Sequence, residues 1–127
     1  MRPDMVLLFV YNINRGNLSG MTDYRQSLAS AKTPGCNLFA LIFSPVGMKK
    51  GWKRFLNDLP YPSRFLYRDE FQQEFSIMKP SVPVVYLQLE KSLHELINTD
   101  EINHITSTDL LIDLVTQRLQ QYHHYNR

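Results

Sequence analysis

Residues 82–89 read VPVVYLQL, a short apolar run that opens on a proline. Such a run between turn-forming neighbours predicts a β-strand. The sequence LHELI at 93–97 predicts a further strand, joined to the first as a hairpin by a turn near residues 90–92. Residues 106–121 then predict a closing helix, with a stripe of leucine and valine on one face and a capping box at its start. The second half of the chain is therefore expected to end in an antiparallel hairpin followed by a helix.

Two more apolar runs lie upstream, MVLLFVY at residues 5–11 and NLFALIF at 37–43. Each is short for a helix and apolar at successive positions, so each predicts a strand with both faces buried. The other elements are predicted from apolar spacing and turn residues: helices at 19–32, 49–59 and 69–75, and a strand at 63–67.

The order of these elements, with helices between the first four strands, predicts one α/β domain over residues 1–127. Alternation of strand and helix favours parallel pairing of the first four strands through right-handed crossovers, with the hairpin as an antiparallel edge. We therefore expect a mixed sheet of about five strands, covered on both faces by about four helices. The tail at 122–127 is polar and is expected to be disordered.

Charge and cysteine content exclude several kinds of protein. The chain has 14 basic and 12 acidic side chains, for a net charge of +2, and this balance argues against a nucleic-acid partner. Its single cysteine, Cys36, rules out an intrachain disulfide and a cysteine-rich metal site. The run at 5–11 is too short to span a membrane or to act as a signal peptide. A cytoplasmic location is expected if the chain is complete, and a periplasmic one if a signal or anchor has been removed.

Two stretches of sequence carry a likeness to a known family. The residues FSI at 75–77, followed after an insertion at 78–80 by VPVVYL at 82–87, are similar to an aromatic-Gly-Val/Ile segment that leads into a strand opening on a cis-proline. The residues LLFVY at 7–11 are similar to a central strand that precedes an active-site turn. On these stretches and the order of elements, the chain resembles the thioredoxin superfamily, most closely its branch of membrane-tethered thiol-disulfide oxidoreductases and peroxiredoxin relatives. The resemblance implies a three-layer α/β/α sandwich and a cis Val82–Pro83 bond.

In that family the turn after the central strand carries the pair Cys-x-x-Cys, and the resemblance places Arg15, Gly16, Asn17 and Leu18 at this position. Thiol–disulfide exchange needs an attacking thiolate and a second sulfur, and neither Arg15 nor Leu18 supplies one. Cys36 stands at the start of the next predicted strand, and we expect it to lie far from the turn. The resemblance thus implies a domain without thiol–disulfide exchange, with no catalytic residue, no metal and no cofactor.

The family's site also includes a groove that receives an extended polypeptide. In this chain the groove would lie between the turn at 14–17 and the loop before the penultimate strand. A cis bond before Pro83 would leave the preceding backbone free to pair with such a segment. We therefore expect a protein-binding or assembly module whose partner is another protein or an extended peptide. The predicted lining residues are Asn14, Arg15, Gly16, Asn17, Val82 and Pro83.

A rival hypothesis uses the same groove for a non-redox reaction or for binding a small anion. Backbone N–H groups at a helix N-terminus attract anions, and the guanidinium of Arg15 would strengthen that attraction. A pocket at Arg15 favours this rival, whereas an open apolar groove favours the binding module. A turn arginine that meets only water is the simpler interpretation of the residue.

The remaining candidates also have simpler structural interpretations. A basic cluster around Trp52 would suit nucleic acid if the indole were exposed, but Trp52 also falls on the apolar stripe of the helix at 49–59. Asp69 and Glu70 are adjacent, so on a helix they diverge and are expected to cap its first turn. The basic cluster comprises Lys49, Lys50, Lys53 and Arg54. The histidines, which lack metal-ligand spacing, are His94, His104, His123 and His124.

Overall fold

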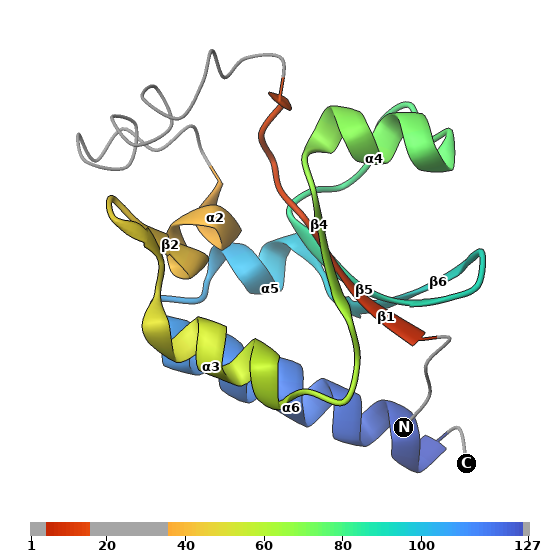
Figure 1. Cartoon of the computed structure of the whole chain (residues 1–127). Helices are drawn as coiled ribbons and strands as arrows, with labels where there is room; N and C mark the ends of the chain where they lie inside the picture. The colour runs from red at the N-terminus through yellow and green to blue at the C-terminus, as the bar shows by residue number, and fades with distance from the viewer. Residues whose placement is uncertain (1–4, 16–35, 126–127) are drawn as a thin grey trace.

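A computed structural model describes residues 5–15 and 36–125 of the chain and shows a mixed α/β fold (Figure 1). Its main sheet has four strands in the order β4-β1-β5-β6. These strands are Met5–Val10 (β1), Ser63–Leu66 (β4), Val84–Leu89 (β5) and Ser92–Ile97 (β6). The helices of the described part are Asn37–Ile42 (α2), Lys50–Asp58 (α3), Arg68–Phe75 (α4), Thr99–Asn103 (α5) and Thr108–Tyr125 (α6). The helix expected at 19–32 lies outside the described residues.

The strand directions differ in part from the expected ones. β1 lies parallel to β4 and antiparallel to β5, which is in turn antiparallel to β6. The expected parallel pairing is therefore correct for β1 with β4 and wrong for β5. The cause lies in α4, whose 8 residues span only about 12 Å and which sits at the edge of the sheet where β1 and β4 end (Figure 1). The chain re-enters the sheet from that same edge, so Val84 at the start of β5 pairs with Val10 at the end of β1.

Both faces of β1 are buried, as its continuous apolar run predicts. Leu7 and Phe9 belong to a large cluster that includes buried residues of α2, α3, α5 and α6. Leu8 and Val10 belong to a second cluster, which includes Phe71 of α4. Helices therefore cover the sheet on both sides, with α4 alone on one side and the other described helices on the opposite side.

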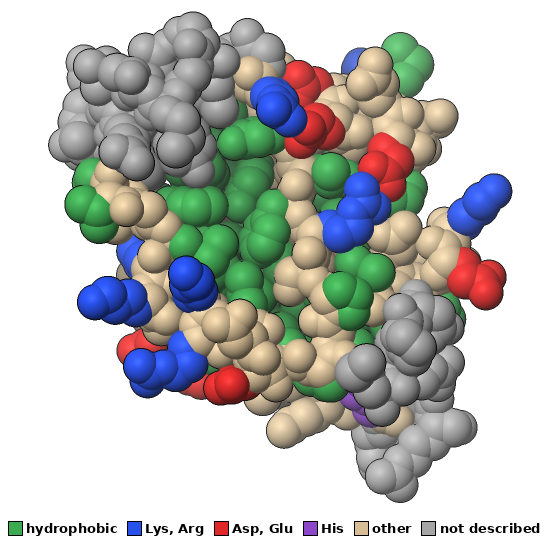
Figure 2. All heavy atoms as spheres, in the orientation of Figure 1, with side chains coloured by type: hydrophobic (Ala, Val, Ile, Leu, Met, Phe, Trp, Pro, Cys, Tyr) green, Lys and Arg blue, Asp and Glu red, His purple; other side chains and the backbone are tan. Residues whose placement is uncertain are grey.

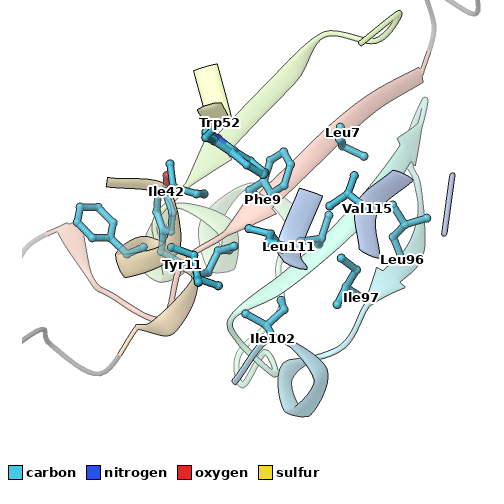
Figure 3. Close-up of a cluster of buried hydrophobic side chains, with 14 of the residues drawn as sticks. Leu7, Phe9, Tyr11, Ile42, Trp52, Leu96, Ile97, Ile102, Leu111 and Val115 are labelled. Atoms are coloured by element: carbon cyan, nitrogen blue, oxygen red, sulfur yellow. The ribbon is translucent and has the colours of Figure 1, made fainter. Parts of the chain in front are cut away.

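The larger cluster contains the aromatic centre of the core (Figure 3). Trp52 of α3 is fully buried, and its ring meets that of Phe9 edge-on with centroids 5.3 Å apart. Leu111 and Val115 of α6 are also fully buried in this cluster. Such an aromatic pair contributes about 0.5–1.5 kcal/mol beyond the burial of its area. The interpretation of Trp52 as a core residue is confirmed.

The apolar run at 37–43 is mostly a helix, so the strand expected there is wrong. Four of the six residues of α2 are buried: Leu38, Phe39, Leu41 and Ile42. A buried helix is apolar all round, and its sequence then matches the continuous apolar pattern of a buried strand. The side chain of Asn37 anchors the helix, because its Nδ2 donates hydrogen bonds to the carbonyls of Ile102 and Ile105 at 2.7 and 2.9 Å.

The main sheet consequently has four strands rather than about five. A separate two-stranded ribbon follows α2, formed by Phe43–Ser44 (β2) and Gly47–Met48 (β3). Gly47 has a φ of 126°, which side chains rarely tolerate, so glycine suits this tight connection. The short helix α5 was not expected from the sequence. It begins at a capping box in which Asn98 accepts a hydrogen bond from the backbone N–H of Glu101 at 2.8 Å.

The last helix is longer than its apolar stripe predicts. α6 begins at Thr108, where Ser107 Oγ accepts a hydrogen bond from the N–H of Leu110, and it continues to Tyr125. The helix thus continues through residues 122–125, which belong to the tail expected to be disordered. Aromatic contacts explain the extension: Tyr122 packs on His94 with ring centroids 4.7 Å apart, and His123 stacks on Tyr61 at 5.7 Å.

Two further observations bear on the expectations. The Val82–Pro83 peptide bond is cis, as the resemblance predicts. Among the helices in the described ranges, none has the length and apolar character needed to cross a membrane.

Candidate functional site

Three loops meet at the edge of the sheet where β1 ends. Because β5 is antiparallel to β1, the loop before Val84 lies beside the turn that follows Val10. Because β6 is antiparallel to β5, the segment after Ile97 reaches the same edge, where Val85 pairs with Ile97. The start of α4 joins them, since β4 runs parallel to β1 and ends beside it. This convergence brings distant parts of the sequence together and makes this edge the candidate site.

Arg68, the first residue of α4, joins the start of that helix to the turn after β1. Its Nε donates a hydrogen bond to the side-chain oxygen of Asn14 at 2.9 Å, and its Nη1 donates to that of Asn12 at 3.0 Å. Its backbone N–H donates to the carbonyl of Ile13 at 2.8 Å. The guanidinium is thus held in place by two uncharged amides.

A cavity of about 550 Å³ lies beside this arginine, and we call it the β1–β5 groove. Its lining combines residues of all three loops and of α4. It comprises Asn12, Arg68, Pro80, Ser81, Val82, Glu95, Asn98, Thr99 and Asp100. The buried hydroxyl of Thr99 has no hydrogen-bond partner among the described residues.

The backbone of Ser81 and Val82 is unpaired at this groove. In the part of the chain that the structure describes, neither residue makes a backbone hydrogen bond, whereas the ladder of β5 begins only at Val84. Backbone N–H and C=O groups are nearly always paired in folded proteins, either within the protein, with water or with a ligand. These groups are therefore available to a partner backbone.

Arg15 lines a different cavity, so the groove predicted from the sequence is divided. A cavity of about 920 Å³ runs along α4 and is lined by Arg15 together with Glu70 and Met78. The backbone N–H of Arg15 donates to Asp69 Oδ1 at 2.9 Å, and its Nη1 donates to Glu70 Oε2 at 3.0 Å. The side chain is 70% exposed, so this ion pair lies at the surface.

The other predicted site residues fall in three places. Asn14 supports Arg68, as described above, and Val82 lines the β1–β5 groove. Pro83 is buried. Gly16 and Asn17 lie outside the described residues. The structure therefore joins Asn14 and Val82 through Arg68, a residue that the sequence did not single out.

Glu70 has the capping role that the sequence predicts. Its Oε1 accepts a hydrogen bond from the backbone N–H of Tyr67 at 3.0 Å, in a capping box at the start of α4. Asp69 Oδ1 accepts from the N–H of Glu70 at 3.1 Å as well as from that of Arg15. The two carboxylates therefore bind backbone and Arg15 rather than facing each other as an acid–base pair.

Cys36 contacts the segment after β1 at Asn12, whereas residues 16–18 of the turn from which it is expected to lie far are outside the described residues. Its Sγ accepts a hydrogen bond from the backbone N–H of Asn12 at 3.2 Å. The residue is only 1% exposed, and burial raises the pKa of its thiol above the ordinary value of 9.0. A thiol that is buried and protonated is a poor nucleophile, because the thiolate is the reactive form.

The basic cluster lacks the exposed indole that the nucleic-acid site considered above would need. Figure 2 shows Lys and Arg side chains on the surface at α3, but the indole of Trp52 is fully buried and cannot stack on a base.

Within residues 5–15 and 36–125, no group of three or more His, Cys, Asp or Glu is placed to hold a metal ion. Comparison of the chain with protein-family models, curated proteins and solved structures finds no match. Function must therefore be inferred from the geometry of the chain itself.

Proposed function

We propose that this chain is a non-catalytic thioredoxin-like domain that binds an extended segment of another protein in the β1–β5 groove. The strand order supports the fold assignment, because the strands β4, β1 and β6 share one direction and β5 alone runs against them. Helices on both faces of the sheet support the same three-layer arrangement.

The unpaired backbone of Ser81 and Val82 is the observation that carries the binding function. An extended peptide can add main-chain hydrogen bonds to unpaired groups of this kind, and side-chain pockets beside them then give specificity. The groove supplies such a pocket directly next to Val82. A partner backbone would thus lie along the 81–82 segment with its side chains directed toward Arg68 and Thr99.

The state of the one cysteine supports a role without thiol–disulfide exchange. Exchange proceeds through a mixed disulfide that a second sulfur resolves. Cys36 is the sole cysteine, is buried, and has a raised pKa. The groove therefore suits recognition better than redox chemistry.

The cavity at Arg15 favours the rival hypothesis, a non-redox enzyme or anion-binding domain, but the charges beside Arg15 count against it. An anion at Arg15 would meet the carboxylate of Glu70 at the guanidinium and that of Asp69 at the backbone N–H. Both carboxylates would repel it.

Selection of peptides tests the proposed function. We would pan a phage-displayed library of short linear peptides on the protein and titrate the best peptide into the ¹⁵N-labelled chain. We expect the amide signals of Asn12, Ser81 and Val82 to shift. The variant Ser81→Trp, which fills the groove from an exposed position, should weaken binding about tenfold or more.

Ser92→Trp is the matched control, because Ser92 is also exposed but lies at the opposite end of the β5–β6 hairpin. It should bind like the unmodified chain. Peptides that bind with signal changes confined to the Arg15 cavity would instead favour the rival hypothesis. A failure to select any peptide would count against the binding function itself.

A further inference from the structure

We propose that the β1–β5 groove selects partner segments that carry an acidic side chain, and that Arg68 is the residue that binds this carboxylate. This inference rests on the proposed function and adds the chemistry of the partner. It is carried by the charge state and hydrogen bonding of Arg68, by its place in the groove, and by the contrast with other arginines of the chain.

Arg68 lacks a carboxylate partner. Arg15, Arg64 and Arg118 each form an ion pair with a glutamate, whereas no carboxylate among the described residues lies within 4.0 Å of Arg68. Asp69, the next residue in the sequence, accepts hydrogen bonds from backbone N–H groups instead. The half-buried guanidinium therefore carries a positive charge that is not in an ion pair with any described residue.

The hydrogen bonds of Arg68 leave room for a ligand. Its bonds to Asn12 and Asn14 use two of the five N–H groups of a guanidinium, which leaves three. A carboxylate accepts two parallel N–H bonds from an arginine, and such charge-assisted pairs are stronger than neutral hydrogen bonds. The two asparagines hold the guanidinium in one orientation, so less side-chain freedom is lost when a carboxylate binds.

Two acidic residues in the same groove refine the expected partner. Glu95 and Asp100 also line the cavity, and both are exposed. They would repel a partner segment with acidic residues along its whole length, and they would attract a basic or polar residue beside the acidic one. The groove therefore suits a segment of mixed charge with one acidic side chain at Arg68.

Asn14→Asp gives the sharpest test, because it places a carboxylate on Arg68 without changing the size of the side chain. The probes are the peptides selected on the unmodified chain and their Glu→Gln or Asp→Asn versions. On the unmodified chain we expect the selected peptides to contain an acidic residue, and its neutral replacement to weaken binding about tenfold. On Asn14→Asp, the same replacement should change binding less than about twofold.

Three further proteins complete the experiment. Arg68→Gln should lose the discrimination between acidic and neutral peptides, and Arg68→Lys should regain part of it. Asn57→Asp makes the same charge change at an exposed position of α3, and it should keep the full discrimination. Thermal unfolding of each variant, followed by circular dichroism, checks that the fold is retained, and the salt dependence of binding should be steeper for acidic peptides than for neutral ones.

The outcomes separate this inference from the proposed function. If peptides bind at Ser81 and Val82 but show no acidic residue, or if neutral replacement costs less than about twofold on the unmodified chain, Arg68 does not select the partner and the binding function stands. If Asn14→Asp folds normally and still discriminates about tenfold, the carboxylate binds elsewhere and the inference is wrong. If no peptide binds, both are wrong.

Discussion

The thiol of Cys36 accepts a hydrogen bond from the backbone N–H of Asn12, with 3.2 Å between sulfur and nitrogen. This contact joins residues that are 24 positions apart in sequence. It places the sole cysteine at the edge of the sheet that carries the candidate site, although the side chain itself is buried. The cysteine therefore contributes to the structure of the site rather than to its exposed surface.

Replacement of Cys36 by serine should destabilise the fold. A serine hydroxyl at this position could still accept the N–H of Asn12, but its own O–H would be buried without a described acceptor. Burying an unsatisfied hydroxyl costs about 1–3 kcal/mol, and we expect a loss of that size in the free energy of unfolding, measured by urea denaturation. A loss below about 0.5 kcal/mol would show that the serine hydroxyl finds a hydrogen-bond acceptor at this position.

The same thiol should make stability depend on alkaline pH. Burial raises the pKa of Cys36 above 9.0, so the folded chain keeps its proton at a pH where the unfolded chain has lost it. The stabilising contribution is complete below the ordinary pKa and is lost as pH rises through the folded value. Between about pH 8 and 10, the free energy of unfolding should fall more steeply for the unmodified chain than for Cys36→Ala.

The comparison with Cys36→Ala removes the contribution of other groups. The pKa values of Tyr67 and Tyr86 are also raised by burial, but both tyrosines are present in the two proteins. Only the difference between the two curves reports on the thiol. Parallel curves across this range would show that the thiol titrates alike in the folded and unfolded chain.

Two adjacent leucines on α6 test the packing of the core. Leu111 is fully buried and Leu110 is 51% exposed. Leu111→Ala should lower the free energy of unfolding by about 2–5 kcal/mol, because it removes buried methyl groups and leaves a cavity. Leu110→Ala should change it by less than about 0.5 kcal/mol. Chemical denaturation of both variants measures the contrast, and equal effects would mean that α6 is rotated about its axis relative to the structure described.

The fold could be predicted from sequence where one pattern has one physical explanation. The run of β1 is apolar at successive positions because both of its faces are covered. The run of α2 looks the same but is a helix, because full burial removes the polar face that distinguishes helical from strand periodicity. Nothing in the residues 37–42 alone separates these two cases.

The candidate site was predicted only in part from the sequence. The family resemblance placed Arg15 and Val82 in one groove, but they line separate cavities. Arg68 was missed because its role depends on side-chain hydrogen bonds to Asn12 and Asn14, which no spacing in the sequence indicates. An arginine at the first position of a helix after a parallel neighbour of the central strand was the available signal.

The protein should not reduce disulfides. With dithiothreitol as the electron source, it should leave the rate of insulin precipitation at the level of dithiothreitol alone, because no second sulfur can resolve a mixed disulfide. A dithiol thioredoxin serves as the positive control, and Cys36→Ser as the matched variant. Acceleration by the unmodified chain that persists in Cys36→Ser would show a reductase activity that no cysteine of this chain explains.

The ion pair of Glu101 and Arg118 should contribute stability that is lost in acid. The hydrogen bond from the Arg118 guanidinium holds the pKa of the Glu101 carboxyl below its ordinary value of 4.5. A lowered folded pKa means that the contribution is present above the ordinary pKa and disappears as pH falls through the folded value.

Glu101→Gln keeps an oxygen that can accept the N–H of Asn98 but removes the charge. Because both side chains are about 30% exposed, we expect this variant to lose only about 0.5–1 kcal/mol at pH 7, and to match the unmodified chain near pH 3. Glu90→Gln, which removes the same charge at an exposed turn position, is the control. A deficit of Glu101→Gln that persists unchanged in acid would mean that its cause is the altered cap of α5 rather than the lost charge.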